Sequence, residues 1–346
     1  MQGVCDCLVA LGPATSTSTT IWAKNSDRPP DEAQELERFP ARRDLGRLRC
    51  THLEIPSSEV ETIGFVGSRP WWLWGVEHGV NDAGVAIGNE AIYTTLDPRS
   101  EPAGLVGMDL VRLGLERAVT AADAVAVITD LIEAHGQGGS GHHGVERPYW
   151  SSFLVADPTT AWVVETSGRT WAVEQVERTR AISNRTTIAA FDVAHGHPRQ
   201  PVAALVDPRL DASRALLAEE PVTVDAVAAH LRSHGSADGW SVCMHVPGVE
   251  ATTASAIVEL ADGGPPLARW LLGSPCTSVY VPVHVGFALG SPTRWARFVR
   301  LGPEHGPVLD DLEAGLAADV AADDAWGPEA WRRVDALLDE LDVVVR

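Results

Sequence analysis

Strands and helices are expected in separate groups along this sequence, and this grouping constrains the fold more than any other feature. Alternating or apolar stretches bounded by turn residues predict strands at residues 5–11, 19–24, 50–55, 61–66 and 85–93, and then helices at 105–118 and 121–134. Further strands are expected at 151–156, 161–165, 170–175 and 180–184, two helices near 210–219 and 223–232, and strands at 251–260, 269–273 and 279–285. Because the order lacks strict β-α-β alternation, a doubly wound parallel sheet is excluded. The pattern predicts an α+β fold with paired helices packed outside two stacked sheets.

The first two strands form a predicted hairpin, since the segment between them, residues 12–18, is rich in turn residues. If the hairpin is centred near Thr15, position i pairs with a position near 30 − i, and Cys5 faces the neighbourhood of Asn25. Cys5, Lys24 and Asp27 would then share one small volume.

Cys5 is a candidate nucleophile because it lies so close to the N-terminus. Only Met1-Gln2-Gly3-Val4 precede it, and this tetrapeptide has neither the basic nor the apolar region of a signal peptide. Cleavage after Val4, by attack of the Cys5 thiolate on the preceding carbonyl, would put a thiol and a free α-amine on one residue. The amine, with an ordinary pKa of about 7.7–8.0, would act as the base near neutral pH.

Lys24 is the single lysine in a chain with 26 arginines. This bias indicates that position 24 requires a compact ammonium, which would lower the pKa of the thiol or hold a carboxylate. Chance retention of one lysine on a surface strand is the alternative.

Composition excludes several classes of function. A net charge of −20 argues against a nucleic acid or an anionic membrane as partner, and no apolar run has the length of a membrane span. Five cysteines, without an export signal, predict free thiols in a reducing cytoplasm. The sequence has no Walker-type phosphate loop, no His-Glu-x-x-His zinc helix and no Gly-x-Ser-x-Gly elbow, and no cofactor is expected.

Several motifs, in order over most of the chain, resemble those of the secernins, a family related to dipeptidase A-type cysteine peptidases and more distantly to choloylglycine-hydrolase-type N-terminal-nucleophile enzymes. The motifs are Cys5-Asp6-Cys7, Lys24-Asn25-Ser26-Asp27-Arg28-Pro29, Ser68-Arg69-Pro70-Trp71-Trp72-Leu73-Trp74-Gly75, Gly88-Asn89-Glu90-Ala91, Gly107-Met108-Asp109-Leu110 and Ile182-Ser183-Asn184. The resemblance becomes weaker after about residue 285. It implies a four-layer αββα sandwich and hydrolysis of dipeptides or other small amides.

The resemblance also implies roles for two asparagines and leaves one role open. Asn89 matches the residue that stabilises the oxyanion, and Asn184 the residue that holds the substrate or the amine of the nucleophile. The alternatives are that Asn89 caps a bulge and that Asn184 forms a turn, as a strand-terminal asparagine more often does. Asp27 would position the Cys5 amine, and Lys24 would balance Asp27. An arginine that choloylglycine-type enzymes use late in the chain has no counterpart in the aligned window, residues 252–255.

Arg69, Trp71 and Trp74 are candidate substrate-binding residues. Three tryptophans so close together can form the wall of an apolar pocket, and an arginine can bind a substrate carboxylate through two hydrogen bonds. Packing between sheet and loop, and an ordinary surface ion pair, are the alternatives.

Other segments are expected to be structural. Residues 28–49 are charged and rich in proline, and predict an irregular excursion with room for one short helix. The glycine- and histidine-rich residues 135–143 are interpreted as a mobile loop over the pocket rather than a metal site, and Cys243 and Cys276 as small buried residues. No metal site is therefore expected.

The predicted domain organisation has a propeptide at 1–4, a hydrolase-like domain at 5–300 and a helical tail at 301–346. Trp331, Val334 and Leu341 lie on one face of a tail helix that opens at Gly327-Pro328. This face either docks on the domain or makes a contact in a homo-oligomer.

Two rival functions remain. One is a binding or regulatory protein that keeps its tetrapeptide. The other is a thiol redox or metal module built on Cys5 and Cys7, whose spacing of two puts both sulfurs on one face of a strand.

Overall fold

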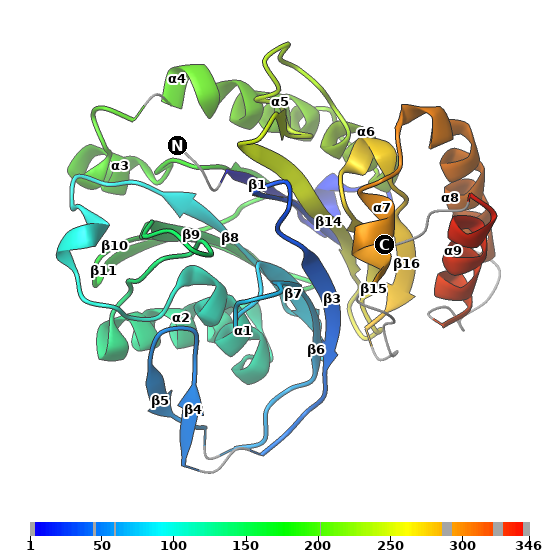
Figure 1. Ribbon diagram of the computed structural model, residues 1–346. Helices are drawn as coiled ribbons and strands as arrows, with labels where there is room; N and C mark the ends of the chain where they lie inside the picture. Colours follow the sequence, from blue (N-terminus) through cyan, green and yellow to red (C-terminus); the bar gives the residue numbers. More distant parts are fainter. Residues whose placement is uncertain are drawn as a thin grey trace.

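Two seven-stranded antiparallel sheets lie face to face in the computed structural model, which describes residues 4–43, 46–58, 60–200, 202–285, 293–320 and 328–341 (Figure 1). The first sheet has the strand order β12 (Thr179–Ile182), β1 (Cys5–Ala10), β2 (Thr20–Arg28), β14 (Glu250–Leu260), β15 (Leu267–Leu272) and β16 (Val281–His284), with β13 (His245–Val246) paired to β14. The second sheet has the order β11 (Thr170–Gln175), β10 (Ala161–Ser167), β9 (Trp150–Ala156), β8 (Ala86–Ile92), β7 (His78–Asn81), β6 (Phe65–Pro70) and β3 (Gln34–Phe39).

Two pairs of helices cover the outer faces of the sheets. Helices α1 (Gly107–Arg117) and α2 (Ala121–His135) share an apolar cluster with the second sheet, and α5 (Asp207–Ala218) and α6 (Val224–Leu231) share one with the first. The predicted four-layer αββα sandwich is therefore confirmed.

Alternation along the inner strands decides which side chains meet between the sheets. Cys7 and Val9 of β1, and Trp22 of β2, belong to the central cluster between the sheets, whereas Leu8 and Ala10 of β1 pack under α5 and α6. The Trp22 Nε1–H donates to the Leu154 carbonyl at 3.2 Å, which ties the two sheets together. The central layer therefore combines apolar packing with a direct hydrogen bond between sheets.

The stretch expected to be irregular, residues 28–49, contains a strand instead. It forms β3, at the edge of the second sheet, paired antiparallel to β6. This strand was not predicted because β3 contains charged residues and lacks an apolar run. Charged residues are common on edge strands, where they discourage pairing with other chains. Gln34, fully buried at the start of β3, donates to Ser26 Oγ at 2.9 Å and Thr253 Oγ1 at 2.8 Å of the first sheet.

Several smaller elements also differ from expectation. The strand predicted at 50–55 is reduced to β5 (Glu54–Pro56), which forms a two-stranded ribbon with β4 (Arg47–Arg49), at the end of the stretch expected to be irregular. The strand predicted at 61–66 lies at β6, which starts at Phe65. Elements that were not predicted are β7, β13 and the short helices α3 (Ala189–His195), α4 (Val202–Leu205) and α7 (Thr293–Phe298).

Helices α8 (Gly306–Val320) and α9 (Pro328–Glu340) lie beside the β16 edge of the first sheet (Figure 1). Trp331, Val334 and Leu338 of α9 are buried in the cluster that also contains the strands β15 and β16. The apolar face of α9 therefore docks on its own chain. The domain boundaries and a homo-oligomer stay predictions, and three of the four residues expected to be a propeptide lie outside the described part of the chain.

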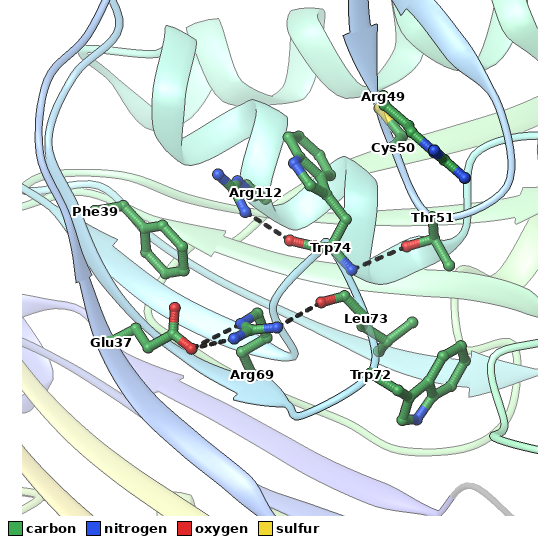
Figure 2. Close-up of a pocket in the computed structure, with 10 residues that line it drawn as sticks. All are labelled: Glu37, Phe39, Arg49, Cys50, Thr51, Arg69, Trp72, Leu73, Trp74 and Arg112. Atoms are coloured by element: carbon green, nitrogen blue, oxygen red, sulfur yellow. Dashed lines mark hydrogen bonds and ion pairs between the residues drawn. The ribbon is translucent and has the colours of Figure 1, made fainter. Parts of the chain in front are cut away.

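A cavity of about 470 Å³ opens between the ribbon of β4 and β5 and the strands β3 and β6 at the edge of the second sheet (Figure 2). Its lining residues are Glu37, Phe39, Arg49, Cys50, Thr51, Arg69, Trp72, Leu73, Trp74 and Arg112. The Arg112 guanidinium lies over the Trp74 ring, 4.0 Å from its centroid. No helix in the described part of the chain combines the length and the apolar character that crossing a membrane requires.

Candidate active site

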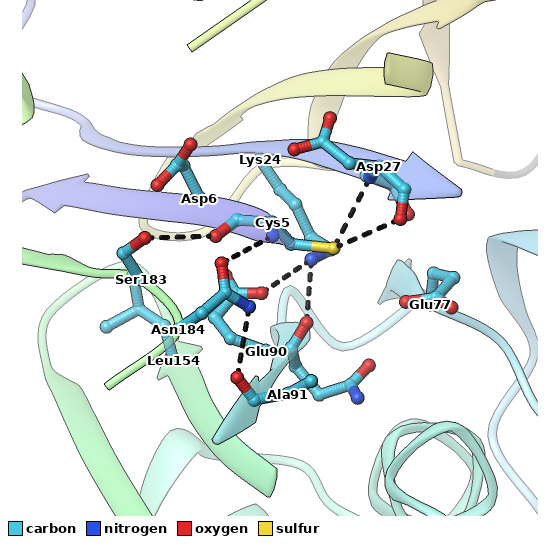
Figure 3. Close-up of polar contacts among 12 residues, drawn as sticks. Cys5, Asp6, Lys24, Asp27, Glu77, Glu90, Ala91, Leu154, Ser183 and Asn184 are labelled. Carbon is cyan, nitrogen blue, oxygen red and sulfur yellow. Dashed lines mark hydrogen bonds and ion pairs between the residues drawn. The ribbon is translucent and has the colours of Figure 1, made fainter. Parts of the chain in front are cut away.

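Cys5 begins β1, an inner strand between β12 and β2, and its side chain is 4% exposed. Its backbone N–H donates to Asn184 Oδ1 at 2.9 Å (Figure 3). Its sulfur accepts from the Asp27 backbone N–H, with N and S 3.4 Å apart. Val4, the preceding residue, is fully buried. Both the sulfur and the nitrogen of Cys5 are therefore held in defined positions.

The hairpin register differs by one residue from the prediction. Cys5 pairs with Ser26 and Cys7 with Lys24, so paired positions sum to 31 rather than 30. Because side chains alternate along a strand, this shift decides their neighbours. Cys5, Cys7 and Lys24 share the face toward the second sheet, whereas Asp27 lies on the opposite face with Asp6.

Lys24 is fully buried and pairs with Glu90 rather than with the expected Asp27. Its ammonium lies 2.8 Å from Glu90 Oε2 and donates to the Asn89 carbonyl at 2.7 Å. Burial raises the pKa of Glu90 to about 7, and the Lys24 charge partly offsets this rise. Burial alone would lower the pKa of Lys24, but nearby groups that are negative when ionised, Cys5 first and then Glu90, raise this pKa well above its usual range.

The environment of Cys5 favours its neutral thiol. Burial raises its pKa well above the usual value, and the charge of Lys24 opposes this rise while Glu90 and Glu77 add to it. A neutral thiol is a poor nucleophile, so the site requires a base that takes the proton as attack begins.

Asp27 directs its backbone toward the sulfur and its carboxylate away from it (Figure 3). The carboxylate accepts from Thr252 Oγ1 at 2.6 Å through Oδ1, while buried Oδ2 has no hydrogen-bond partner among the described residues. Burial raises the pKa of Asp27 well above its usual range, and the charge of Asp6 adds to the rise. The expected contact of this carboxylate with the Cys5 nitrogen is replaced by that of Asn184.

Asn184 joins Cys5 to a buried arginine that was not expected. Its Oδ1 accepts from Arg209 Nη2 at 2.9 Å as well as from Cys5, and its Nδ2 donates to the Ala91 carbonyl at 3.0 Å. Arg209 Nη1 lies 2.6 Å from Asp6 Oδ2, and both side chains are buried. Arg209 is on α5, well before the window searched for a late arginine. Nothing in the sequence separates it from the other 25 arginines.

Asn89 lies on the face of β8 that is turned toward α1. Its Nδ2 is 3.6 Å from Met108 Sδ, and its buried Oδ1 has no hydrogen-bond partner among the described residues. Glu90, the next residue, faces Lys24 instead. A role for the Asn89 amide at the oxyanion stays a prediction that requires this side chain to turn. A carboxylate at position 90, in a strand where Asn89 is the one other polar residue, was the available signal for Glu90.

Gly88 leaves the room that Lys24 needs. A Cβ at this position would lie 2.8 Å from Lys24 Cδ and 3.0 Å from Cys7 Sγ, too close for either contact. Only glycine therefore fits opposite the pair of Lys24 and Cys7.

A network around Arg28 fixes the loop between α2 and β9. Arg28 lies 3.1 Å from Glu77 Oε1 and 2.5 Å from Glu32 Oε1, and it donates to the Gly141 carbonyl at 2.8 Å. His52 Nε2 is 2.8 Å from the Ser140 carbonyl oxygen. The loop, expected to be mobile, is thus bound to the buried Arg28 on one side and to the exposed His52 on the other.

His142, on this loop, gives a pH-dependent prediction. It is 3% exposed, and burial, with the charge of Arg28, lowers its pKa to about 3. Because the unfolded histidine titrates near 6.5, the unfolded state binds more protons between pH 6.5 and 3, and stability falls as the pH drops through this range. Between pH 7 and 4.5, the free energy of unfolding of His142→Leu should fall less than that of the wild type. We expect the difference, measured by urea unfolding at both pH values, to be on the order of 3 kcal/mol.

The matched control is His143→Leu, which changes an exposed histidine on the same loop. Its pH dependence should equal that of the wild type. Equal acid sensitivity of all three proteins would contradict the assignment to His142.

The three predicted substrate-binding residues lie apart from Cys5. Arg69 already pairs with Glu37 and Glu35 and donates to the Leu73 carbonyl at 2.9 Å. Arg69 and Trp74 line the cavity of Figure 2. Trp71 is not among the lining residues; it is 48% exposed and its ring lies 4.7 Å from that of His143. Their role in binding substrate stays a prediction, and for Arg69 it would require exchange of an existing carboxylate partner.

The chain resembles solved structures at low sequence identity, whereas no protein-family model matches it. A mutant of conjugated bile acid hydrolase from Clostridium perfringens is 10% identical over 81% of this chain and 92% of that one, with a TM-score of 0.50. Penicillin V acylase from Agrobacterium tumefaciens is 14% identical over 81% of this chain and 86% of that one, with a TM-score of 0.49. The likeness to the bile acid hydrolase shows a shared fold.

Proposed function

We propose that this chain is a cysteine-type N-terminal-nucleophile amidohydrolase that cleaves the C–N bond of a small amide through an acyl-enzyme on Cys5. The observation that carries the proposal is the position of Cys5. It begins an inner strand, with its nitrogen bound to Asn184 Oδ1 and its sulfur to the Asp27 amide. This arrangement supports a role for the sulfur as the nucleophile and for the nitrogen of the same buried residue as its base.

The first step is cleavage of the Val4–Cys5 bond. The Cys5 sulfur attacks the Val4 carbonyl carbon, the C–N bond breaks, and the thiol proton passes to the released nitrogen. Water then hydrolyses the resulting thioester, which frees the thiol and leaves Met1 to Val4 as a peptide acid. The new α-amine remains beside Asn184 Oδ1 and can accept a proton near neutral pH.

In turnover the α-amine takes the thiol proton while the sulfur attacks the substrate carbonyl, and it then gives the proton to the leaving amine. Water next hydrolyses the thioester on Cys5, which releases the acid and restores the thiol. Asn184 orients the amine, and Arg209 with Asp6 holds Asn184 in place. Lys24 lies on the thiol face and favours both thiolate and oxyanion, since two of its three ammonium donors are used among the described residues. Asp27 contributes its backbone N–H, which donates to the Cys5 sulfur. Asn89 joins the oxyanion site if it leaves Met108.

We propose a dipeptide as the substrate, which makes the chain a dipeptidase. Support comes from the secernin-like and dipeptidase A-like motifs, which include Cys5, Lys24, Asp27 and Asn184. The fold shared with a hydrolase of conjugated bile acids is compatible with other small amides. The alternative is a binding or regulatory protein, in which Val4 remains joined to Cys5.

Intact mass and substrate turnover test the proposal together. We expect purified wild-type chains to lack Met1 to Val4 and to release amino acids from members of a dipeptide library. Acyl-amides, including a conjugated bile acid, form the second set of substrates. Full-length chains without turnover of either set would favour the binding protein; turnover of acyl-amides alone would keep the hydrolase and reject the dipeptidase.

A further inference from the structure

Four side chains near strand β13 of the first sheet form a cluster of sulfur and nitrogen atoms. They are His234, Cys243, His245 and Cys276, and one ligand atom from each lies within 4.8 Å of all the others. They come from the loop after α6, the segment that leads into β13 together with the first residue of β13, and the short turn Pro275–Thr277. The chain thus brings together residues that are up to 42 positions apart (276 − 234).

The spacing within the cluster suits a tetrahedral metal ion. His245 Nε2 is 3.3 Å from Cys243 Sγ and 3.1 Å from Cys276 Sγ. With Zn–S near 2.3 Å and Zn–N near 2.0–2.1 Å, sulfur and nitrogen ligands of one zinc ion are about 3.5 Å apart. The rings of His234 and His245 are 5.2 Å apart between centroids. All four residues can therefore reach one ion with small adjustments.

The donor set identifies the kind of metal. Two thiolates and two imidazoles are soft and borderline ligands that select zinc over magnesium or calcium, and two thiolates neutralise its charge. Cys243 is fully buried, Cys276 is partly exposed rather than buried as expected, and both histidines are exposed, so an ion could enter from solvent. We propose that His234, Cys243, His245 and Cys276 bind one zinc ion in a closed, structural site.

The ion would fix a loop that supports the strand β2. Met244, between two of the ligands, donates its N–H to Thr252 Oγ1 at 2.9 Å, and Thr252 donates to Asp27 Oδ1 at 2.6 Å. The Val242 carbonyl accepts from Asn25 Nδ2 at 2.8 Å. Since four protein ligands leave no open position, the zinc would hold this loop and take no part in hydrolysis. The inference is independent of the proposed function.

Metal content tests the site directly. We expect full-length protein, expressed with zinc under reducing conditions and freed of any affinity tag, to contain about one zinc ion per chain by mass spectrometry of the metal. Cys276→Ser, at the partly exposed ligand, should lower zinc to a tenth or less. Replacement of zinc by Co²⁺ in the wild type should produce a thiolate-to-cobalt charge-transfer band, which requires no variant to fold.

Two controls separate this site from other cysteines. Cys50→Ser, at a buried cysteine outside the cluster, should keep the zinc, and so should Cys5→Ala. Loss of zinc from Cys5→Ala but not from Cys276→Ser would move the metal to the Cys5 and Cys7 pair and overturn the proposal. A wild-type chain with no zinc above the Cys276→Ser level, or with only three titratable thiols because of a Cys243–Cys276 disulfide, would overturn it too.

Discussion

Cys5→Ala is expected to abolish both cleavage after Val4 and turnover of substrate. Alanine has no sulfur to attack a carbonyl, and removal of the nucleophile from a catalytic unit typically costs about 10³- to 10⁶-fold in kcat. Intact mass should show a chain that still begins at or near Met1, and amino acid release from a cleaved dipeptide should fall to background. The fold should persist, because the side chain lost is small and Val4 and Asn184 remain in place.

Cys7→Ala is the matched control, since Cys7 is an equally buried thiol two residues later on the same face. It should still be cleaved after Val4 and should keep most of its turnover. A Cys5→Ala chain that is cleaved at the same bond and works as well as the wild type would remove the nucleophile from the mechanism.

Lys24→Met should destabilise the protein by about 3–5 kcal/mol at pH 8, the usual cost of removing one partner of a buried ion pair. Glu90 would be left without its cation in a fully buried position, and it would have to take up a proton. The pKa of Glu90, already raised to about 7, would rise further. A carboxyl whose pKa is higher in the folded than in the unfolded state stabilises the fold below its unfolded pKa, and this stabilisation is lost as the pH rises. The destabilisation caused by Lys24→Met should therefore be smaller at pH 5 than at pH 8.

Urea unfolding at both pH values measures this effect, and Lys24→Met with Glu90→Gln is the informative double variant. It removes both charges, so it should recover stability relative to Lys24→Met and lose the steep dependence on pH. Glu54→Gln, in the exposed pair with Arg47, should change stability by less than about 1 kcal/mol. An equal loss for Lys24→Met at pH 5 and pH 8 would contradict the role of Glu90.

Local patterns in the sequence were enough to predict the layers. Apolar stretches and turn residues located most strands, and the order of strands and helices excluded parallel α/β folds. The strand β3 was missed because its charged residues lie at a sheet edge, where solvent rather than a core decides the composition. Prediction therefore succeeded where burial leaves a periodic pattern.

Local spacing predicted the candidate site only as far as the hairpin extends, and the resemblance to the secernins added Asn184, whose Oδ1 lies 2.9 Å from the Cys5 nitrogen. Cys5 and Lys24 share a face because they lie on paired strands, and pairing follows from local turn geometry. A shift of one residue moved the Asp27 carboxylate to the other face, and the partners Glu90 and Arg209 come from distant segments. The proposed zinc site was missed for the same reason, since its four residues come from three separate segments.

The complete burial of Lys24 has a consequence for chemical labelling of this protein. As the chain has no other lysine, the folded molecule presents no lysine side chain to amine-reactive dyes, cross-linkers or conjugating enzymes. If the bond after Val4 is cleaved as we propose, a tag placed on the α-amine of Met1 would leave with residues 1–4. Loss of that tag would follow the maturation reaction in real time, without any engineered reporter.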